Sequence, residues 1–529
     1  MKSTFAPPFQ GGEPRATSLL DDGFRRRGAW RDEARARSTQ GTSPLLIDAL
    51  AGQRPLSPAQ RRSLDALAER GTVAVVTGQQ IGLFLGPLYT FYKAASAISW
   101  ARAIEAETGV RCVPIFWLQT EDHDFAEIAS CVLPGVPEPL ALPAWPGAQT
   151  RTSVAYAKVP REIEALLARL EAALATLPHA AETLLLVREA WQPGRSLAEA
   201  FAAMLASLFG DEGLLILDPR CAVVARLSAP LYQAAVERQQ AIESALAERS
   251  AALSRAELLE QVHLRPGSPL VFFHGQAPEG PRHRLQRQES GGFLLDGGGE
   301  ISREALIAAA RSDPLLFSSS ALLRPLVQDS ILPVVAYVGG PAELGYLAQA
   351  APLYPLLGVR PALAVPRSRF RLVDARAAAL LQSLQLAPCD LETARDSLLA
   401  RLGAARVGSA SPGDLARSLL GELPPALAAS ARKHPALEKA ARRTRLSVER
   451  AVSRFANRHA RLLAAEDTTL AARIDKLQAA LFPAGAPQER VHSLPWYAAR
   501  HGIAALKAAV QGAIQPGHPQ LGAVQDLSP

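Results

Sequence analysis

The sequence predicts an α/β protein whose core is joined to a long helical segment, and two patterns support this. Three apolar runs of β type each end in glycine and charged residues and then give way to a helical pattern, at 73–93, 113–124 and 331–346. Such strand-to-helix junctions are typical of a parallel sheet covered by helices. The second pattern is the segment between Pro435 and Pro483, which contains neither proline nor glycine and therefore favours continuous helix.

The first junction follows the apolar run 73–76 and predicts a loop that binds a ligand. A helix that begins here would present unpaired N–H groups and the positive end of its dipole. Glycine in such a loop lets the backbone approach an anion closely. The spacing matches neither the dinucleotide fingerprint nor the Walker loop, so the ligand stays open. The candidate residues are Thr77, Gly78, Gln79, Gln80, Gly82, Gly86, Tyr89 and Lys93.

The second junction places acids around a histidine, directly after the apolar run 113–117. Glu121, Asp122, His123 and Asp124 follow one another there. An imidazole titrates near neutral pH, so His123 is a candidate general base that Asp122 or Asp124 would orient. The alternative is a solvated loop in which Asp122 or Asp124 is a helix N-cap. One histidine with acids suits a hard cation only loosely, and we predict no metal site.

The third junction surrounds the apolar run 331–338. Pro341 fits the first position of a helix, where a missing N–H costs nothing. Arg324 and Asp329 have an alternative role, which is to pair with each other. The candidate binding residues are Arg324, Gln328 and Asp329 before the run, and Gly339, Gly340, Glu343 and Tyr346 after it.

Taken in order, these blocks resemble the bacillithiol biosynthesis cysteine-adding enzyme family, BshC. The order and spacing match over residues 70 to 505. Two positions depart from the family pattern, with Ile81 where proline is common and Leu85 where glycine is common. The matching blocks are Thr77–Gln80 with Gly86–Thr90, Phe116–Trp117 with Glu121–Asp124, Arg324–Pro325 with Gln328–Asp329, Gly339–Pro341 with Glu343, and Pro487–Arg490.

The resemblance implies an enzyme that joins L-cysteine to glucosaminyl-malate by an amide bond. It also implies a Rossmann-like core of nucleotidylyltransferase type with connecting insertions, and a helical coiled coil that supports a homodimer. ATP is a candidate nucleotide, whose use by the family is unsettled. The block at Pro487–Arg490 adds Arg490 as a binding residue.

A chain of 529 residues is too long for one core, so several domains are expected. We expect a partly ordered extension at 1–42, a catalytic core with insertions at 43–370, a helical coiled-coil domain at 371–483, a return segment that packs on the core at 484–515, and a loose tail at 516–529.

Apolar residues recur at steps of three and four along the long helical segment, which predicts a coiled-coil seam. Helical patterns within 372–402 supply a partner, and a second subunit would complete the coil. The seam residues are Leu437, Ala441, Val448, Val452, Phe455, Leu462, Leu470, Ile474, Leu477 and Leu481.

Composition excludes several classes of partner. The net charge of +7 comes without basic residues interleaved with aromatics or a nucleic-acid module, so we expect an arginine-rich surface and no nucleic acid. No apolar run of about 18 residues occurs, which argues against a membrane span. The N-terminus lacks the apolar centre of a secretory signal. The four cysteines are widely spaced, which indicates reduced thiols rather than disulfides. Together these features predict a cytoplasmic protein.

The expected chemistry begins with an activated cysteine carboxylate, because amide formation from a free carboxylate is uphill in water. N–H groups at Gly78–Gly82 would hold the developing negative charge, with Lys93, Arg324 or Arg490 as cations. His123 would take the proton of the sugar amine, and Gln79, Gln80 and Tyr89 would bond the sugar. Two alternatives stay open: a nucleotidylyl- or glycosyl-type transferase acting on another sugar, and a non-catalytic protein that binds a sugar or nucleotide.

Overall fold

The computed structural model describes residues 2–407, 418, 429, 435–466 and 468–529. The chain divides into two compact units. The first comprises Met1–Phe370 with His492–Leu527 and contains the parallel sheet, and the second comprises Arg371–Val491. Within the predicted helical domain, residues 408–417, 419–428, 430–434 and 467 lie outside the described residues.

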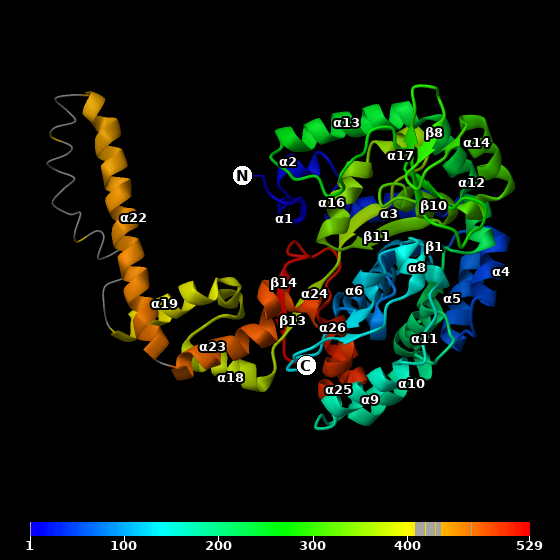
Figure 1. Cartoon of the computed structure of the whole chain (residues 1–529). Coiled ribbons are helices and arrows are strands. Elements are labelled where there is room, and N and C mark those ends of the chain that lie inside the picture. The colour runs from blue at the N-terminus through cyan, green and yellow to red at the C-terminus, as the bar shows by residue number, and fades with distance from the viewer. Residues whose placement is uncertain (1, 408–417, 419–428, 430–434, 467) are drawn as a thin grey trace. The chain divides into compact units, whose positions relative to one another are not determined.

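A five-stranded sheet forms the centre of the first unit, and all of its pairings are parallel. The strands are fully buried in the middle, as their continuous apolar runs require when helices cover both faces. Figure 1 shows these strands inside the unit. In sheet order the strands are β12 (Leu363–Pro366), β11 (Val334–Gly339), β1 (Val73–Gln79), β2 (Cys112–Leu118) and β5 (Leu215–Leu217).

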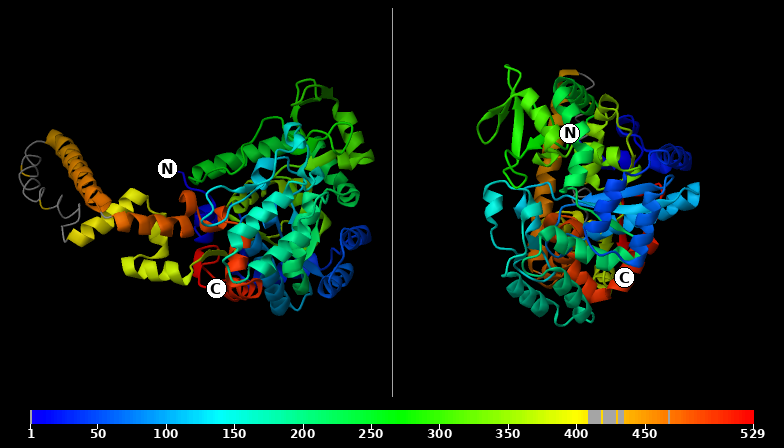
Figure 2. Two further views of the ribbon diagram at one scale, coloured as in Figure 1. Left: turned by 60° about the horizontal axis from the view of Figure 1, so that its bottom comes forward. Right: turned by 90° about the vertical axis from the view of Figure 1, so that its right-hand side faces the viewer.

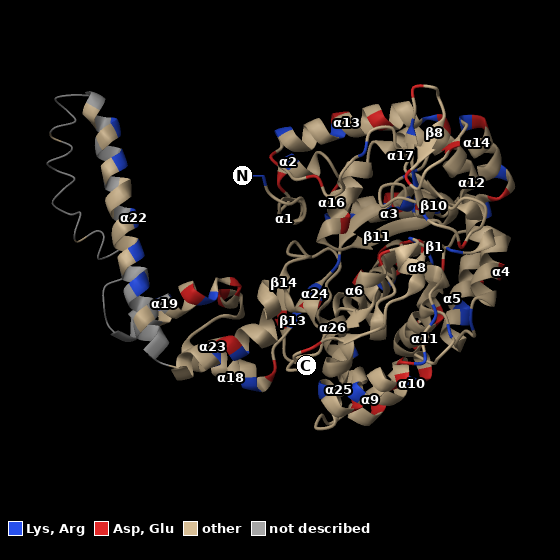
Figure 3. Cartoon of the chain, in the orientation of Figure 1, with Lys and Arg blue, Asp and Glu red and all other residues tan. Residues whose placement is uncertain are grey.

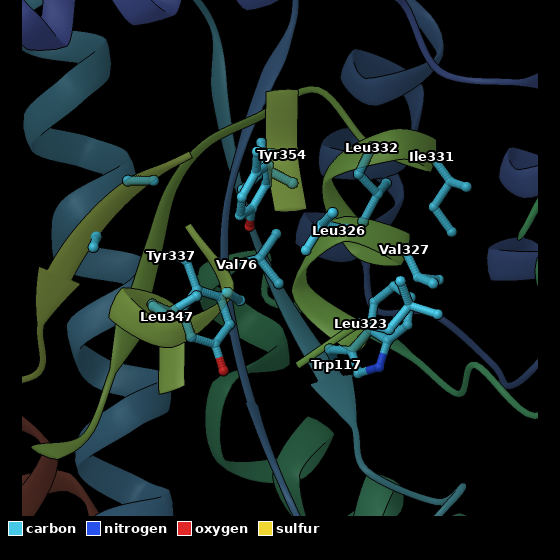
Figure 4. Packing of buried hydrophobic residues seen from close by; sticks show 14 of the residues in the cluster. Val76, Trp117, Leu323, Leu326, Val327, Ile331, Leu332, Tyr337, Leu347 and Tyr354 are labelled. Atoms are coloured by element: carbon cyan, nitrogen blue, oxygen red, sulfur yellow. The ribbon is translucent and has the colours of Figure 1, made fainter. Parts of the chain in front are cut away.

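Helices surround this sheet (Figures 1 and 2). The alanine-rich helix α6 packs on β1 and β2 and ends at Gly109, whose φ of 70° is the left-handed conformation that glycine adopts most readily. Figure 4 shows side chains from β1, β2, β11, α15, α16 and α17 packed in one core. The helices are α4 (Pro44–Gly52), α5 (Pro58–Ala68), α6 (Tyr89–Thr108), α11 (Leu197–Phe209), α12 (Ala222–Glu237), α13 (Gln239–Arg255), α14 (Arg303–Ser312), α15 (Arg324–Ile331), α16 (Pro341–Ala350) and α17 (Leu353–Leu357).

A second, antiparallel sheet lies in the first unit and supplies one wall of the site described below. Its strand β7 pairs with β6 on one side and β8 on the other. In sheet order it consists of β10 (Phe317–Ser319), β6 (Val271–Phe273), β7 (His283–Arg287), β8 (Phe293–Leu295) and β9 (Glu300–Ile301).

The N-terminal residues differ from the partly ordered extension that the sequence predicted. They form α1 (Ala6–Gln10), α2 (Pro14–Thr17) and α3 (Arg27–Arg37). Phe9 and Phe24 are fully buried, and the indole of Trp30 meets that of Trp100 at 4.9 Å between ring centroids. Burial of these aromatic rings orders the segment although its other residues are small or charged.

The last residues also differ from the predicted loose tail, because Leu521 is buried and residues Val524–Leu527 form strand β14. Before them, α25 (Leu494–His501) and α26 (Ile503–Ala513) belong to the first unit. The backbone N–H of His179, ahead of α10 (Ala180–Ala190), donates to the carbonyl of Ala499 at 2.8 Å. This part of the predicted return segment therefore packs within the first unit, beside α10, which itself packs on α9 (Ile163–Leu174).

The second unit has a helical core of its own. Its helices are α18 (Ala375–Leu384), α19 (Arg395–Val407), α22 (Pro435–Glu466), α23 (Thr468–Leu481) and the short α24 (Gln488–Val491). The last four residues of the predicted seam, Leu470 to Leu481, are buried against Leu381, Leu391 and Leu398.

Three residues in the earlier part of that seam are exposed. Leu437, Phe455 and Leu462 of α22 are 45%, 69% and 59% exposed. Figure 3 shows basic residues along the same helix. Partner helices α18 and α19 lie where the sequence placed them, and both contact α23. The described helices of this unit thus pack on one another, while α22 carries exposed apolar side chains.

Substitution of Gly78 tests how tightly β1 and β2 pack. A Cβ atom at Gly78 would lie 2.6 Å from the carbonyl oxygen of Trp117, which is backbone and cannot move aside. Gly78→Ala should therefore lower the free energy of unfolding by about 1–3 kcal/mol in urea titrations. Gly512→Ala on α26, where no atom lies within 4 Å of a new Cβ, is the control and should not destabilise. Equal stability of both variants would contradict this packing.

Candidate functional site

The three junctions singled out from the sequence lie on neighbouring strands. In the sheet, Gly78 is paired with Trp117 on β2, and Thr77 with Val338 on β11. Because parallel strands end at the same edge, the residues after β1, β2 and β11 meet there. Strand order reverses between β1 and β11, which is the position where open α/β sheets usually bind ligands.

Where the strand order reverses, between β1 and β11, a buried ion pair of the protein occupies the crevice. Lys93 of α6 pairs with Glu343 of α16, and both side chains are almost fully buried. The Lys93 ammonium also donates to the Gly78 carbonyl at 2.6 Å and to Gln79 Oε1 at 2.9 Å. Burial lowers the pKa of Lys93 to about 8. The Gly340 N–H donates to Glu343 at 2.7 Å, where an anion would otherwise cap α16.

A buried network continues from Glu343 to Arg324. Tyr337 donates to Glu343, and the Tyr346 hydroxyl lies 3.2 Å from the same carboxylate oxygen. Arg324 in turn donates to the hydroxyls of Tyr337 at 3.0 Å and Tyr346 at 2.8 Å. The guanidinium group is thereby held in one orientation by groups on β11 and α16.

Arg324 and Asp329 do not pair directly, which was the alternative left by the sequence. Gln328 lies between them, accepting from Arg324 at 3.1 Å and donating to Asp329 at 3.0 Å. Asp329 also accepts from the Tyr354 hydroxyl at 2.9 Å, and burial raises its pKa. Gln328 and Asp329 therefore link α15 to α17 inside the core.

A cavity of about 800 Å³ opens at the end of β2. Its size suits a small polar ligand. Trp117 lines it, and its indole N–H is buried without a hydrogen-bond partner among the described residues. The other polar residues at this inner end are Gln119, Glu121, Asp122, His123, Arg282, Ser319, Ser320, Arg324 and Tyr346.

The imidazole ring of His123 lies near both the Asp122 carboxylate and the Arg282 guanidinium group. Its Nδ1 atom lies 3.5 Å from Asp122 Oδ1 and 3.4 Å from an NH group of Arg282. Asp122 also accepts from the His123 backbone N–H at 2.8 Å and from Gln80 at 3.1 Å. Burial alone would raise the pKa of Asp122, but the hydrogen bond with His123 and the charge of Arg282 hold it well below its usual value.

Arg282 is a site residue that the sequence analysis missed. It precedes β7, within a part of the core for which the sequence predicted no site residue, and it lies 160 residues from Asp122 along the chain. Its guanidinium donates to Ser318 Oγ at 3.2 Å and to the Ser319 carbonyl at 2.8 Å, over the ring of Phe272. These contacts aim its remaining NH group at Asp122 Oδ1, 3.3 Å away.

Glu121 and Asp124 differ in their surroundings although they lie in one cluster. Glu121 lines the cavity and accepts from Ser319 Oγ at 2.7 Å, and burial raises its pKa. Asp124 is exposed and accepts from the Glu127 N–H at 3.2 Å, as the N-cap of α7 (Phe125–Ile128). The structure thus shows the capping alternative for Asp124 and leaves Asp122 beside His123.

The glycine-rich loop does not line this cavity. The Gly82 N–H donates to Gln80 O at 3.0 Å and the Gly86 N–H to Leu83 O at 2.9 Å, so the loop closes on itself. A Cβ at Gly82 would lie 2.8 Å from Gly86 Cα. The Gly82 and Gly86 N–H groups therefore bond within the loop, and the charge-binding role of Gly78–Gly82 stays a prediction.

The remaining predicted residues support the strands. Thr77 donates to the Val338 carbonyl at 2.8 Å, and Gln79 donates to the Tyr89 hydroxyl at 3.1 Å. The Gly339 carbonyl accepts from the Arg367 N–H at 2.9 Å. Arg490 is exposed on α24 in the second unit.

Two further features bear on the chemistry. Among the residues described, no three His, Cys, Asp or Glu side chains are grouped as a metal site would need, and no helix is both long and apolar enough to cross a membrane. All four cysteines are free thiols, and burial raises the pKa of Cys112, Cys131 and Cys221. None of the four lines the cavity.

Comparison with known proteins identifies the family. The family model described as "Bacillithiol biosynthesis BshC, N-terminal Rossmann-like domain" matches residues 2–368. The chain belongs to the BshC family. The predicted Rossmann-like α/β core is thereby confirmed, and the match includes the N-terminal helices.

Curated relatives in the BshC family cover most of the chain. A protein of Solibacter usitatus named "Putative cysteine ligase BshC" is 35% identical over 468 residues, which is 87% of this chain and 85% of the relative. Proteins with the same name from Koribacter versatilis and Heliobacterium modesticaldum are 32% and 30% identical, over 86% and 85% of this chain and 85% and 82% of their own lengths. The chain is accordingly an enzyme of a ligase family.

The raised pKa of Glu121 predicts a pH-dependent stability. Below its ordinary pKa of 4.5 the carboxyl is protonated in both states. As the pH rises above that value, the unfolded chain releases the proton first, so the native state loses stability until its own, higher pKa is passed. Glu121→Gln cannot ionise, and it should gain free energy of unfolding relative to the wild type between pH 4.5 and neutrality.

Urea unfolding at several pH values measures this gain. Glu164→Gln, at an exposed acid on α9, is the matched control and should show no such trend. A difference between Glu121→Gln and the wild type that is constant from pH 4.5 to 8 would show that Glu121 is not held in its neutral form by burial.

Proposed function

We propose that this chain joins L-cysteine to glucosaminyl-malate by amide-bond formation in bacillithiol biosynthesis. The observation that carries the proposal is the cavity at the end of β2, where His123, its partner Asp122 and two cations, Arg282 and Arg324, lie together. Family membership supports the reaction class, and the relatives' name supports cysteine as a substrate.

In this proposal His123 removes the proton of the attacking sugar amine. A neutral imidazole can accept that proton at Nε2 in the tautomer that carries its hydrogen on Nδ1, which lies 3.5 Å from Asp122 Oδ1. The imidazolium that forms is stabilised by the Asp122 carboxylate, whose low pKa keeps it ionised. Arg282 donates a hydrogen bond to the same carboxylate and holds it in position.

Arg282 and Arg324 supply the positive charge that the glycine-rich loop does not. The carbonyl of an activated cysteine carboxyl group develops negative charge on oxygen when the amine attacks, and fixed cations in a buried site stabilise it. The C–N bond then forms as the bond from the carbonyl carbon to the activating group breaks, and that group leaves with the electron pair. Arg324 is 6% exposed and is held by two tyrosine hydroxyls, so its charge is already oriented before a substrate binds. Lys93 is engaged with Glu343 and acts through this network rather than on the substrate.

The direct test is to incubate the purified protein with glucosaminyl-malate, cysteine and ATP and to follow products by mass spectrometry. A product with the mass of the cysteinyl amide is expected. A parallel tube without ATP establishes whether a nucleotide activates the carboxylate. Absence of amide in both tubes, from folded protein, would contradict the proposal and favour a transferase that acts on another sugar.

Replacement of His123 tests its role as the general base. His123→Ala should lower the turnover number by about 10²- to 10⁴-fold, the usual contribution of such a group, while the fold persists because the ring is partly exposed. Asp124→Ala is the matched control from the same loop. It removes only an exposed N-cap, so it should keep its turnover and lose about 1 kcal/mol of stability. Full turnover of His123→Ala would refute the assignment.

We also propose that the chain forms a homodimer through α22. Val448, Phe455 and Leu462 repeat every seven residues, which is the spacing of a coiled-coil seam, and Phe455 is 69% exposed. Burying such a face against its copy removes apolar surface from water. The rest of the second unit has its own core and does not need a partner.

Sedimentation equilibrium tests this dimer. The wild type should have twice the chain mass of 56.3 kDa, and Phe455→Asp should return it to one chain mass. Leu185→Asp, at a residue of α10 that is 59% exposed, is the control and should leave the mass doubled. A wild-type protein of one chain mass at all concentrations would rule out the dimer.

A further inference from the structure

The outer part of the cavity carries two arginines without a protein partner. Arg265, in the segment before β6, and Arg284, on β7, both line the cavity. Within the described part of the chain, neither side chain donates a hydrogen bond or forms an ion pair. Arg265 is exposed and Arg284 is partly buried. Because guanidinium groups bind carboxylates and phosphates through paired hydrogen bonds, two of them on one cavity are a candidate anion site.

The acids nearby are engaged elsewhere. Asp296 pairs with Arg151 and accepts from the backbone N–H of Arg284 at 3.0 Å. Glu243, on the α13 side of the cavity, accepts from Gln239 at 2.9 Å. Neither acid forms an ion pair with Arg265 or Arg284 among the described residues.

The two guanidinium groups carry like charges and line the same cavity. The pKa of Arg284 is lowered first by partial burial and then by the charges of Arg265 and Arg151, against the opposing effect of Asp296. Holding like charges together without a counter-ion is unfavourable unless a bound anion relieves the repulsion. A ligand with carboxylate groups would do so, with bidentate hydrogen bonds to each guanidinium.

The position of Arg284 on β7 relates the two arginines to the end of the cavity that contains His123. Arg282 contacts Asp122 and His123, and Arg284 lies two residues further along the chain. Two residues of an extended strand span about 7 Å, and side chains two apart leave the same face. The positive pair thus lies about one sugar ring from His123, and one ligand can reach both.

We propose that Arg265 and Arg284 bind the carboxylate groups of the amine substrate, and so select an amino sugar that carries an acidic substituent over a neutral one. The inference rests on the proposed function, in which malate, a dicarboxylate, is attached to the sugar. When the amine of the sugar lies beside His123, its acidic substituent extends along β7 to Arg284. Arg265, in the segment before β6, binds the same substituent.

Calorimetric titration of the full-length protein tests the pair without requiring turnover. The probes are glucosaminyl-malate, methyl glucosaminide, which lacks the carboxylates, and ATP. The wild type should bind glucosaminyl-malate at least tenfold more tightly than methyl glucosaminide. Arg265→Gln and Arg284→Gln should each weaken the binding of glucosaminyl-malate by about 10- to 100-fold, which is the effect of losing a charged hydrogen-bonding partner. The affinity for methyl glucosaminide should not change.

The matched control is Arg287→Gln, at an arginine on the same strand that does not line the cavity. It should bind both sugars as the wild type does. Circular dichroism on each variant shows that the strand still folds.

The outcomes separate this inference from the proposed function. Folded Arg265→Gln and Arg284→Gln proteins that bind glucosaminyl-malate as tightly as the wild type would overturn it, as would a wild type that does not prefer the acidic sugar. If the two arginine substitutions weaken only the binding of ATP, the inference is also overturned, and the pair is a phosphate site instead. Arginine-dependent binding of glucosaminyl-malate without amide formation would uphold the inference and refute the proposed function.

Discussion

The buried ion pair between Lys93 and Glu343 organises the carboxyl edge of the parallel sheet. It joins α6 to α16 across β1 and β11, and its charges are met by the Gly78 carbonyl, Gln79 and the Gly340 N–H. Removing two charges from water is costly, and such a pair persists only where further hydrogen bonds satisfy it. Here they do, and loss of either partner would leave an unpaired charge in the core.

Because this pair occupies the crevice at the strand reversal, the cavity lies to one side, at the end of β2. Its floor comes from the parallel sheet and the Arg324 network, and its wall comes from the antiparallel sheet. Arg282 belongs to that wall and contacts Asp122 of the floor. The candidate cluster is thus assembled where two sheets meet, and Ser318 and Ser319 of β10 hold the arginine that bridges them.

Much of the fold could be predicted from the sequence because its signals are local. Uninterrupted apolar runs revealed β1, β2 and β11, and glycine with charge after each revealed the edge where they end. Five predicted residues line the cavity, namely Glu121, Asp122, His123, Arg324 and Tyr346. The sequence could not show that the Gly82 and Gly86 N–H groups bond within the loop, since that depends on a turn in which Phe84 and Leu85 have positive φ.

The sequence by itself determined the parallel core, the family and the cluster that contains His123, because apolar periodicity and short motifs are properties of neighbouring residues. Only the tertiary structure decided which members of that cluster act together. Asp122 and Asp124 are equivalent in sequence, yet one meets His123 and the other caps α7, since their side chains leave the backbone in different directions. Arg282, Arg265 and Arg284 could be found only after folding, because contacts across more than a hundred residues leave no local pattern.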